Sequence, residues 1–395
     1  MVIDGGGLAK KPCAEGPAPG TLVRVNIDIV QIPLPHSAEA PVDPLYEAYA
    51  HVSRAEDIHF YGNDDLVSDA REYFIEDANQ KYQRTARWVA FPAGERAPER
   101  AVAIAAIDYP VADNTHLAYT WIVTHPEWRS QGIATALLPT IEESLRHSGR
   151  TTIQVWSNHS PYRGEDGLEA KSGVGRVNPA EPSARWLTAL GYELEQTERH
   201  SVLDIPADDD PWWRELRARR EKDAATAGAL YELVQWQGAT PPESRAEYAR
   251  LRERMSVDAP DADLDFEEEK WDEERIADRD ARMADMGRGA IMTAVRHVPS
   301  GILVAYSELY WPLERPAGVW QFDTFVHGEH RGHRLGALVK AANLQLLREV
   351  NPLSQRIHTW NAGENEHMLA INVELGFTPR SVEGGWQKRV GAPAP

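Results

Sequence analysis

The sequence has very little cysteine, no long apolar run and no excess of basic residues. Cys13 is the one cysteine among 395 residues, which excludes a disulfide framework and a cysteine-ligated metal site. This cysteine usage favours the cytoplasm. No stretch reaches the roughly 20 apolar residues that a membrane-spanning helix requires. We expect residues 1–21, rich in Gly, Pro and Ala, to form a flexible tail and not a signal peptide.

The charged residues are mostly acidic. There are 61 Asp and Glu against 42 Lys and Arg, a formal net charge of −19. Binding of nucleic acid needs a basic stripe, which the sequence lacks, so we expect no such partner. The acidity either attracts cations such as protonated amines or serves solubility alone. The length fits two domains of roughly 150–200 residues.

The chain contains an internal duplication. Residues 123–145, VTHPEWRSQGIATALLPTIEESL, match residues 325–347, FVHGEHRGHRLGALVKAANLQLL, so that Arg129 corresponds to Arg331. Further on, ARWLTALGYELE is echoed by LAINVELGFTPR, and Gly191 corresponds to Gly376. From Arg to Gly the spacing is 62 residues in the first copy and 45 in the second. The difference falls in the loop-like segment 159–179.

Hydrophobic periodicity predicts the same order of elements in both copies. In the first we expect a strand at 21–32, two helices within 43–80, strands at 87–91, 101–109 and 117–124, a helix after 131, a strand at 151–157, a helix at 183–190 and a closing strand pair at 192–205. In the second we expect a strand at 230–236, helices within 244–285, strands at 290–298, 301–311 and 319–326, a helix after 333, a strand at 356–361, a helix at 366–375 and a final strand.

This order predicts an α/β fold with a mixed sheet and helices on its faces. We place an N-terminal domain at 22–205, a linker at 206–228 and a C-terminal domain at 229–395. The linker has proline and an acidic run, and we expect Trp212 and Trp213 to pin it between the domains.

The segment Arg129–Ala134, RSQGIA, lies between a strand end and the start of a helix. The first N–H groups of a helix lack internal partners, and a glycine lets a ligand approach the backbone closely. Such a turn binds a phosphate or pyrophosphate, although one Arg-x-x-Gly-x-Ala is also typical of a plain helix start. Its recurrence at Arg331 favours the phosphate interpretation.

A strand leads into each turn, and a helix, a strand, a second helix and a Leu-Gly-aromatic triplet follow it, with the triplets at residues 190–192 and 375–377. This order resembles the GNAT acetyltransferase superfamily over residues 22–205 and 229–392. The resemblance implies two tandem acyl-CoA-binding domains, each a mostly antiparallel twisted sheet with helices on both faces. It also implies a V-shaped opening in the sheet that receives acetyl-CoA. The layout is similar to that of two-domain actinobacterial acetyltransferases such as the mycothiol synthases.

The resemblance implies which residues hold the coenzyme. The strand before each turn pairs with the pantetheine arm, and the turn amides bind the pyrophosphate. In the first half these residues are Ile122, Val123, Thr124, Arg129, Ser130, Gln131, Gly132, Ile133 and Ala134. In the second half they are Thr324, Phe325, Val326, Arg331, Gly332, His333, Arg334, Leu335 and Gly336, together with Asn365.

The second turn departs from the family pattern. Arg334 stands where the first copy has Gly132. The substitution either narrows the approach to the backbone or adds a guanidinium contact to the phosphate. Gly332 could supply some of the lost freedom.

The first half departs from the pattern elsewhere. Family members often carry an Asn, then a Tyr seven residues on that returns a proton to the CoA thiolate, then a Gly four beyond. Asn365, Asn372 and Gly376 keep this spacing, with Asn372 at the Tyr position. The matching residues in the first half are Ala180 and Leu187, and leucine has no proton to donate.

Acetyl transfer to an amine needs a base. A primary amine has a pKa near 10.4 and must lose a proton before it attacks a thioester. Asp323 and Glu308 are the candidate bases in the second half, and Gln321 is a candidate for orienting the substrate. Asp108 and Tyr119 are the equivalents in the first half, and each is also typical of an ordinary strand residue.

Two further clusters have alternative interpretations. The segment 257–285 has 13 Asp and Glu against 4 Lys and Arg. It is either a wall that steers a cationic acceptor or a solvated helix face. His327, His330 and His333 lack the spacing of zinc ligands, so we expect no metal site and place them near the CoA phosphates.

These observations predict an acetyl-CoA-dependent N-acetyltransferase. We expect direct transfer to a primary amine of a small molecule in a ternary complex, because no nucleophilic cysteine is available. We place the chemistry in the second half, with Asn372 as proton donor, and expect a monomer or homodimer without a membrane partner. Three alternatives stay open: chemistry in the first half, a non-catalytic acyl-CoA-binding or sensing protein, and a protein or peptide lysine acetyltransferase.

Overall fold

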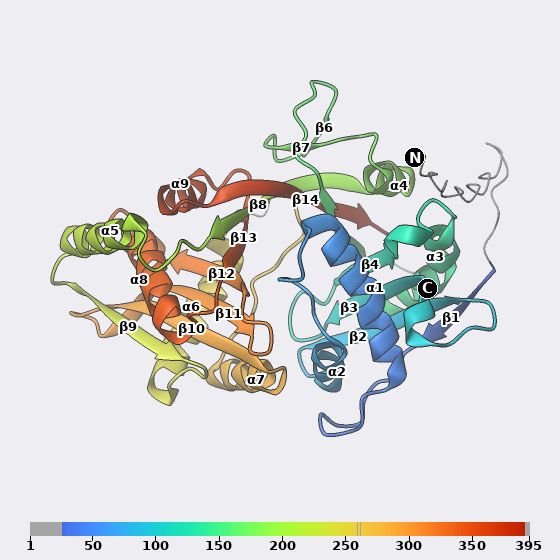
Figure 1. Ribbon diagram of the computed structural model, residues 1–395, viewed down its shortest axis with the longest axis horizontal. Helices are drawn as coiled ribbons and strands as arrows, with labels where there is room; N and C mark the ends of the chain where they lie inside the picture. The colour runs from blue at the N-terminus through green and yellow to red at the C-terminus, as the bar shows by residue number, and fades with distance from the viewer. Residues whose placement is uncertain (1–25, 259, 261, 392–395) are drawn as a thin grey trace, which may run out of the picture.

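The computed structural model describes residues 26–258, 260 and 262–391. The expected tail at 1–21, with Cys13, lies outside the described residues. Two halves lie side by side, and long strands cross between them (Figure 1). Within the described part, no helix is both long enough and apolar enough to cross a membrane.

The first half follows the predicted order. Its elements are β1 (Ile27–Gln31), α1 (Pro44–Tyr61), α2 (Ala70–Ala78), β2 (Gln83–Pro92), η1 (Pro98–Arg100), β3 (Ala103–Pro110), β4 (Leu117–Thr124), η2 (Pro126–Trp128), α3 (Ile133–Ser148), β5 (Thr152–His159), β6 (Leu168–Glu169), β7 (Arg176–Val177), α4 (Pro182–Ala189) and β8 (Glu193–Asp204). The extra segment 159–179 forms the small β6–β7 hairpin, which projects at the top of Figure 1.

The second half repeats this order after an additional helix. Its elements are α5 (Pro211–Ala227), β9 (Tyr231–Gln237), α6 (Pro242–Asp258), α7 (Glu273–Asp285), β10 (Arg288–His297), β11 (Ile302–Pro312), β12 (Gly318–Val326), η3 (Gly328–His330), α8 (Leu335–Val350), β13 (Arg356–Ala362), α9 (Glu366–Leu375) and β14 (Thr378–Arg389). Helix α5 lies within the segment predicted as a linker, and its Trp213 is buried against α8 of the second half, not between the two halves as we expected.

Four helices begin at an aspartate cap. Asp43, Asp69, Asp210 and Asp272 precede α1, α2, α5 and α7, and each side chain accepts a backbone N–H from the first turn. These bonds satisfy donors that the helix itself leaves unpaired.

The two halves share one sheet. The described strands form a 12-stranded sheet in the order β1-β2-β3-β4-β5-β14-β8-β13-β12-β11-β10-β9. Only β4–β5 and β12–β13 pair in parallel, so the sheet is mostly antiparallel, as predicted. The mixed α/β class is therefore confirmed.

The closing strands are exchanged between the halves. The last strand of the second half, β14, pairs with β5 of the first, and β8 of the first half pairs with β13 of the second. The strand pair that we expected at 192–205 is one continuous strand, β8, whose second neighbour is β14. Neither half completes its sheet from its own chain segment.

The helices lie on both faces of the sheet. Helices α1 and α2 pack with Phe91 and Ile104 on one face, and α3 packs with Trp88 and Ile107 on the other. In the second half, α6 and α7 cover the first of these faces and α8 covers the second. Helix α5 covers the outer side of α8 and leaves α8 buried along residues 335–344.

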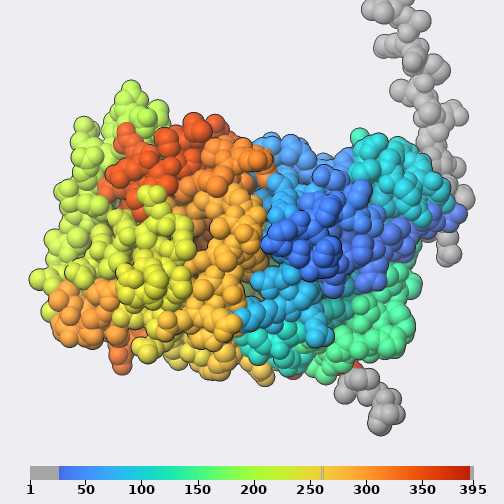
Figure 2. All heavy atoms as spheres, turned by 90° about the horizontal axis from the view of Figure 1, so that it is seen from below, coloured from blue at the N-terminus to red at the C-terminus, as the bar shows by residue number. Residues whose placement is uncertain are grey.

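Each half also extends a loop over the other. In the α1–α2 loop, Asp65 accepts from Nη2 of Arg356 on β13 at 2.8 Å. In the α6–α7 loop, Asp265 accepts from the hydroxyl of Thr152 on β5 at 2.7 Å. Figure 2 shows the blue first half and the yellow-to-orange part of the second half meeting along one seam.

The exchange makes a stability prediction. Trp386 on β14 is fully buried in a cluster of first-half residues that includes Leu187 and Leu194, and its Nε1 donates to Ser157 on β5 at 2.8 Å. We expect Trp386→Ala to lower the free energy of unfolding by about 3–5 kcal/mol, because it leaves a cavity in the first half. Urea unfolding followed by circular dichroism measures this loss. Val373→Ala, at a residue 62% exposed, is the control that should change little; an equal effect of both variants would contradict the exchange.

Candidate active site

The sheet opens at the same place in each half. The parallel pair β4–β5 is joined only from Leu117↔Thr152 to Tyr119↔Gln154, and β12–β13 only from Gly318↔Arg356 to Trp320↔His358. Beyond these points the paired strands diverge, and the described strands offer no ladder partner to that edge of residues 120–124 or 321–326. Unpaired backbone groups of this kind can receive an extended amide-containing ligand. The openings contain the predicted segments Ile122–Thr124 and Thr324–Val326.

The two openings differ by a β-bulge. The β11–β12 register shifts between Ser307↔Thr324 and Leu309↔Gln321, so Phe322 and Asp323 together oppose Glu308. The β3–β4 register runs without a shift from Ala103↔Thr124 to Asp108↔Tyr119. The bulge changes the direction of the β12 backbone beside the second opening, and the first opening has no such bulge.

Gln321 supports this bulge. Its Nε2 donates to the backbone oxygen of Glu308 at 2.9 Å and to the hydroxyl of Ser307 at 3.0 Å. The side chain is 5% exposed, so the structure gives it a positioning contact to β11 in place of the predicted contact to substrate.

Both predicted phosphate turns have the same backbone. Each has two residues in the left-handed region: Ser130 (φ 62°) and Gly132 (φ 78°) in the first, Gly332 (φ 87°) and Arg334 (φ 62°) in the second. Each turn thus has one glycine and one other residue, in opposite order. The first turn has glycine at its second left-handed position, Gly132, and the second turn has glycine at its first, Gly332.

The helices that follow these turns begin without a side-chain cap. Gly132 and Arg334 are the N-cap residues of α3 and α8, and neither provides a capping hydrogen bond. The first N–H groups of both helices therefore remain available to an anion. These turns fit a pyrophosphate.

The arginines of the turns form ion pairs with carboxylates of the same chain. Arg129 pairs with Glu56 on α1, and Arg331 lies 3.4 Å from Asp258 at the end of α6. Arg334 Nε donates to Asp223 on α5 at 2.9 Å, and its Nη2 donates to Glu374 on α9 at 2.8 Å. Of the two roles considered for Arg334, the structure favours neither, because its guanidinium is bound by these two carboxylates.

The two asparagines of the second half have different partners. The side chain of Asn365 accepts the backbone N–H of Met368 at 3.2 Å and caps α9. Asn372 is 2% exposed, and its amide donates to Asn361 Oδ1 at 2.6 Å. Among the described residues its own Oδ1 is buried without a partner. An amide has no titrating proton, so Asn372 can hydrogen-bond to a ligand but not protonate it.

Glu308 is neutralised by two arginines. Its carboxylate accepts from Arg252 at 2.8 Å, from Arg279 at 2.5 Å and from Tyr248 at 3.1 Å. Burial opposes its charge, but Arg279 and Arg252 outweigh burial and hold the pKa of Glu308 below its usual value. A carboxylate of this kind is a weak base.

Asp323 has the opposite environment. It lies in the bulge with 24% of its side chain exposed, and its carboxylate is 3.2 Å from Arg252. Burial raises the pKa of Asp323, Arg252 opposes this, and Glu308 adds to the rise. Of the two predicted bases, Asp323 is the one whose basicity is increased.

The central strands carry a group of side chains that we call the central face: Trp156 and Asn158 on β5, Glu383 on β14, Glu198 on β8 and Trp360 on β13. Glu383 pairs directly with Glu198 and with Asn158, so these three project to one side of the sheet. Trp156 is two residues from Asn158, and Trp360 stacks on His200, two residues from Glu198, with 4.6 Å between ring centroids. All five are partly exposed.

The two glutamates of the central face titrate far above their usual range. Burial, followed by Glu383, Glu364 and Asp323, raises the pKa of Glu198 from 4.5 to about 8. Burial raises the pKa of Glu383 to about 7. The central face thus lies near Asp323 of the second opening, and a cation bound there would relieve the repulsion between carboxylates.

Part of the acidic segment 257–285 faces solvent, and part of it contacts the first half. Its acidic side chains contact the first half, as when Asp278 accepts from Lys81 at 2.6 Å and from Tyr82 at 2.8 Å. Its Arg275 points inward and lies 4.4 Å from the ring centroid of Trp271, and Arg252 on α6 lies at the same distance from that ring. The carboxylates that act on Asp323 include Glu308 on β11 and Glu269 of this segment, and Glu198 on the closing strand β8 is in turn affected by Asp323.

The first-half candidates lie apart from the central face. Asp108 accepts from the hydroxyl of Thr85 at 2.8 Å, and burial raises its pKa to about 6. Tyr119 is the last paired residue before the first opening, and burial raises its pKa. Leu187 is 2% exposed in an apolar cluster and offers no polar group to the opening.

A cavity of about 260 Å³ lies beneath α7. Its lining comes mainly from β9, β10, β11 and α7 and is mostly apolar, with Arg245, Arg279, Asp280, Arg288 and Glu308 as charged members.

Comparison with known proteins agrees with this geometry. The sequence model of the acetyltransferase (GNAT) family matches residues 54–161, within the first half. No curated protein sequence matches the chain. The structure resembles that of a tandem GNAT protein from the clavulanic acid biosynthesis pathway, with a TM-score of 0.65 and 22% identity, covering 93% of this chain and 99% of that one.

A second solved structure, a GCN5-related N-acetyltransferase from Sphaerobacter thermophilus, has a TM-score of 0.53 and 14% identity, covering 92% of this chain and 96% of that one. These likenesses show the fold, and the tandem arrangement predicted from the duplication is confirmed.

The shared backbone of the turns predicts opposite effects of two glycine substitutions. Ser130→Gly should stabilise the protein by up to about 1 kcal/mol, because a left-handed residue with a side chain costs about 1–2 kcal/mol. Arg334→Gly should destabilise it by about 1–3 kcal/mol, because Asp223, 2% exposed, loses its guanidinium partner. Urea unfolding measures both. Adding Asp223→Asn to Arg334→Gly should recover part of the loss, and a gain in stability from Arg334→Gly alone would refute the structural role of this ion pair.

Proposed function

We propose that this chain, which carries a GNAT acetyltransferase domain within a tandem GNAT fold, transfers an acetyl group from acetyl-CoA to the primary amine of a small molecule. The observation that carries the proposal is the second opening with its bulge, where Asp323 has a raised pKa beside the acidic central face. We place the chemistry in the second half for this reason.

The residues present fit the coenzyme. The uncapped first turn of α8, at Gly332–Gly336, offers N–H groups to the pyrophosphate, and the free edge of Thr324–Val326 offers backbone partners to the pantetheine arm. When bound, acetyl-CoA supplies the activated acetyl group as a thioester. The first half, with Ile122–Thr124 and the turn at Arg129–Ala134, serves as a second binding copy.

The chain's own residues then act on the acceptor. Glu198 and Glu383 hold the protonated amine, with the faces of Trp156 and Trp360 beside it. Asp323 takes a proton from the ammonium nitrogen, which frees the lone pair for attack on the thioester carbonyl. Asn372 stands at the position of the family's tyrosine, and its remaining amide N–H would donate a hydrogen bond to the leaving sulfur. The thiolate would then take its proton from solvent.

An alternative within the enzyme class places the chemistry in the first half. It is favoured by one observation: α8 and α9 pack closely, since a Cβ on Gly336 would lie 3.3 Å from Ile371. That packing narrows the approach to the second opening, whereas the buried residues of α3 are Ile133, Leu137 and Ile141 and its other side is open.

The role of Asp323 is tested by Asp323→Asn. We expect kcat for CoA release, measured with acetyl-CoA and a panel of small amines, to fall by about 10²–10⁴, because the base is lost. In the wild type, kcat/KM should rise with pH through the raised pKa of Asp323, since the base works only when deprotonated. The affinity for acetyl-CoA, measured by calorimetry, should stay within about threefold of the wild type, which we take as unchanged binding.

Asp108→Asn is the matched variant in the first half and should leave kcat unchanged. The reverse pattern would move the chemistry to the first half. Binding of acetyl-CoA without turnover on any amine would favour a sensing protein over an enzyme.

The central face makes a prediction about pH and stability. A carboxylate whose pKa is raised on folding stabilises least when it is ionised, so Glu198 and Glu383 should cost stability as pH rises from 4.5 to about 8. We expect Glu383→Gln to raise the melting temperature relative to the wild type at pH 8 and to have little effect at pH 4.5. It should also raise KM for the amine.

Glu193→Gln, at an exposed glutamate on β8, the strand that pairs with β14, is the control and should show no such trend. If the melting temperatures of Glu383→Gln and the wild type differ by the same amount across this pH range, the pKa of Glu383 is not raised by folding.

A further inference from the structure

The 3₁₀ turn η3 (Gly328–His330), which precedes the second phosphate turn, differs from its counterpart in the first half. The first half has HPEW at 125–128, and the second has HGEH at 327–330. Both copies keep the histidine and the glutamate. The second copy replaces tryptophan with another histidine, His330, and thereby gathers three side chains that can ligate a metal.

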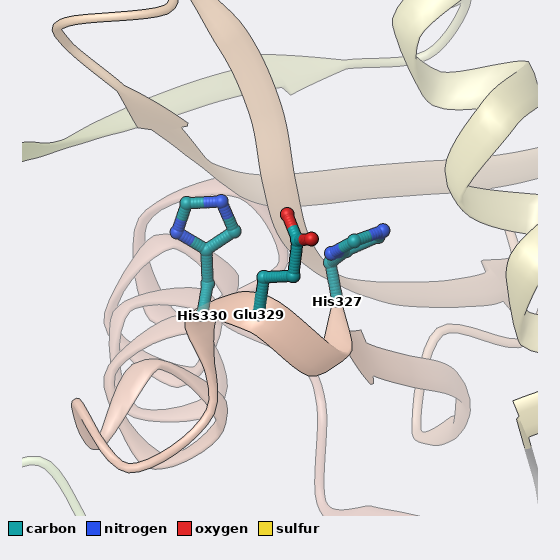
Figure 3. Close-up of side chains that lie close together, drawn as sticks. All are labelled: His327, Glu329 and His330. Carbon is teal, nitrogen blue, oxygen red and sulfur yellow. The ribbon is translucent and has the colours of Figure 1, made fainter.

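These three side chains converge. Ligand atoms of His327, Glu329 and His330 all lie within 4.8 Å of one another. The Glu329 carboxylate lies between the two imidazole rings (Figure 3). Side chains three residues apart are eclipsed in a 3₁₀ turn, which places the two histidines on the same side of η3.

Each imidazole has a nitrogen available for a ligand. His327 Nδ1 is buried and lacks a hydrogen-bond partner within the described part of the chain. In the first half the equivalent Nδ1 of His125 accepts the backbone N–H of Glu127 at 3.3 Å. The second copy has lost this cap.

His330 is oriented by a second contact. Its Nδ1 lies 3.0 Å from the hydroxyl of Tyr231 on β9, which leaves Nε2 for a ligand. Metal-ligating histidines commonly have their second ring nitrogen hydrogen-bonded in this way.

We propose that His327, Glu329 and His330 form a site for a divalent transition-metal ion such as Zn²⁺, with a fourth position open to water. Two imidazoles and one carboxylate are a donor set that suits Zn²⁺ in a tetrahedral arrangement. The bound ion ties the start of the second phosphate turn together. The site does not depend on the acetyl transfer proposed above.

The test uses the full-length chain with Cys13→Ser, which removes its only thiol, and Zn²⁺ and Co²⁺ as probes. After treatment with a chelator, calorimetry should detect one equivalent of Zn²⁺, and Co²⁺ should produce the visible absorption of a tetrahedral site. His330→Trp, which restores the residue of the first copy, should abolish both signals. Tyr231→Phe should weaken the affinity for Zn²⁺ by about 10–100-fold.

The controls separate this site from other histidines and from misfolding. His147→Gln, at an exposed histidine on α3, should leave binding unchanged, and His327→Gln should reproduce His330→Trp with a native circular dichroism spectrum. The proposal is overturned if the parent chain binds no stoichiometric Zn²⁺. It is equally overturned if the His330→Trp and His147→Gln variants bind alike, which would identify an adventitious surface ion only.

Discussion

The antiparallel pairing of β8 with β14 is the interaction on which the arrangement of both halves depends. Each strand belongs by sequence to one half and completes the sheet of the other, so the halves cannot separate without breaking the sheet. The same pairing brings the closing strands between the two openings. A side chain at the middle of either strand therefore lies near both halves, which an ordinary pair of linked domains would not achieve.

The duplication explains the charge at this position. Glu198 and Glu383 each lie six residues after the aromatic residue that follows the Leu-Gly pair, so they are equivalent in the two copies and face each other across the pseudo-twofold axis. Like charges opposite one another destabilise an antiparallel pair. Natural sequences tolerate such local conflict chiefly where function requires it.

Local patterns were sufficient to predict most of the elements, although helix α5 was missed because its segment was assigned to a linker. The tandem fold followed from the repeat. The exchange of closing strands was not predictable, because a strand such as 193–204 has the same alternation whether its neighbour comes from its own half or the other. For the same reason Glu198 and Glu383 went unnoticed, although their equivalent positions were a usable signal. The sequence showed that Arg334 replaces a glycine. It did not show that each turn has two left-handed residues, and that the glycine occupies the second of them in the first turn and the first of them, Gly332, in the second turn.

The two copies have diverged in opposite directions around a common backbone. In the second half, α5 covers α8. The Arg334 side chain is bound by Asp223 on α5 and by Glu374 on α9, away from the backbone amides of its turn. A helix start that keeps its N–H groups free while its side chain is anchored elsewhere is still an anion site. A bulge and a buried polar network at Ser307, Gln321 and Asn343 hold the adjacent strand in place. This rigidity, rather than the glycine itself, is what a preorganised reaction site requires, and it is the physical reason for assigning the chemistry to the half whose turn departs further from the family pattern.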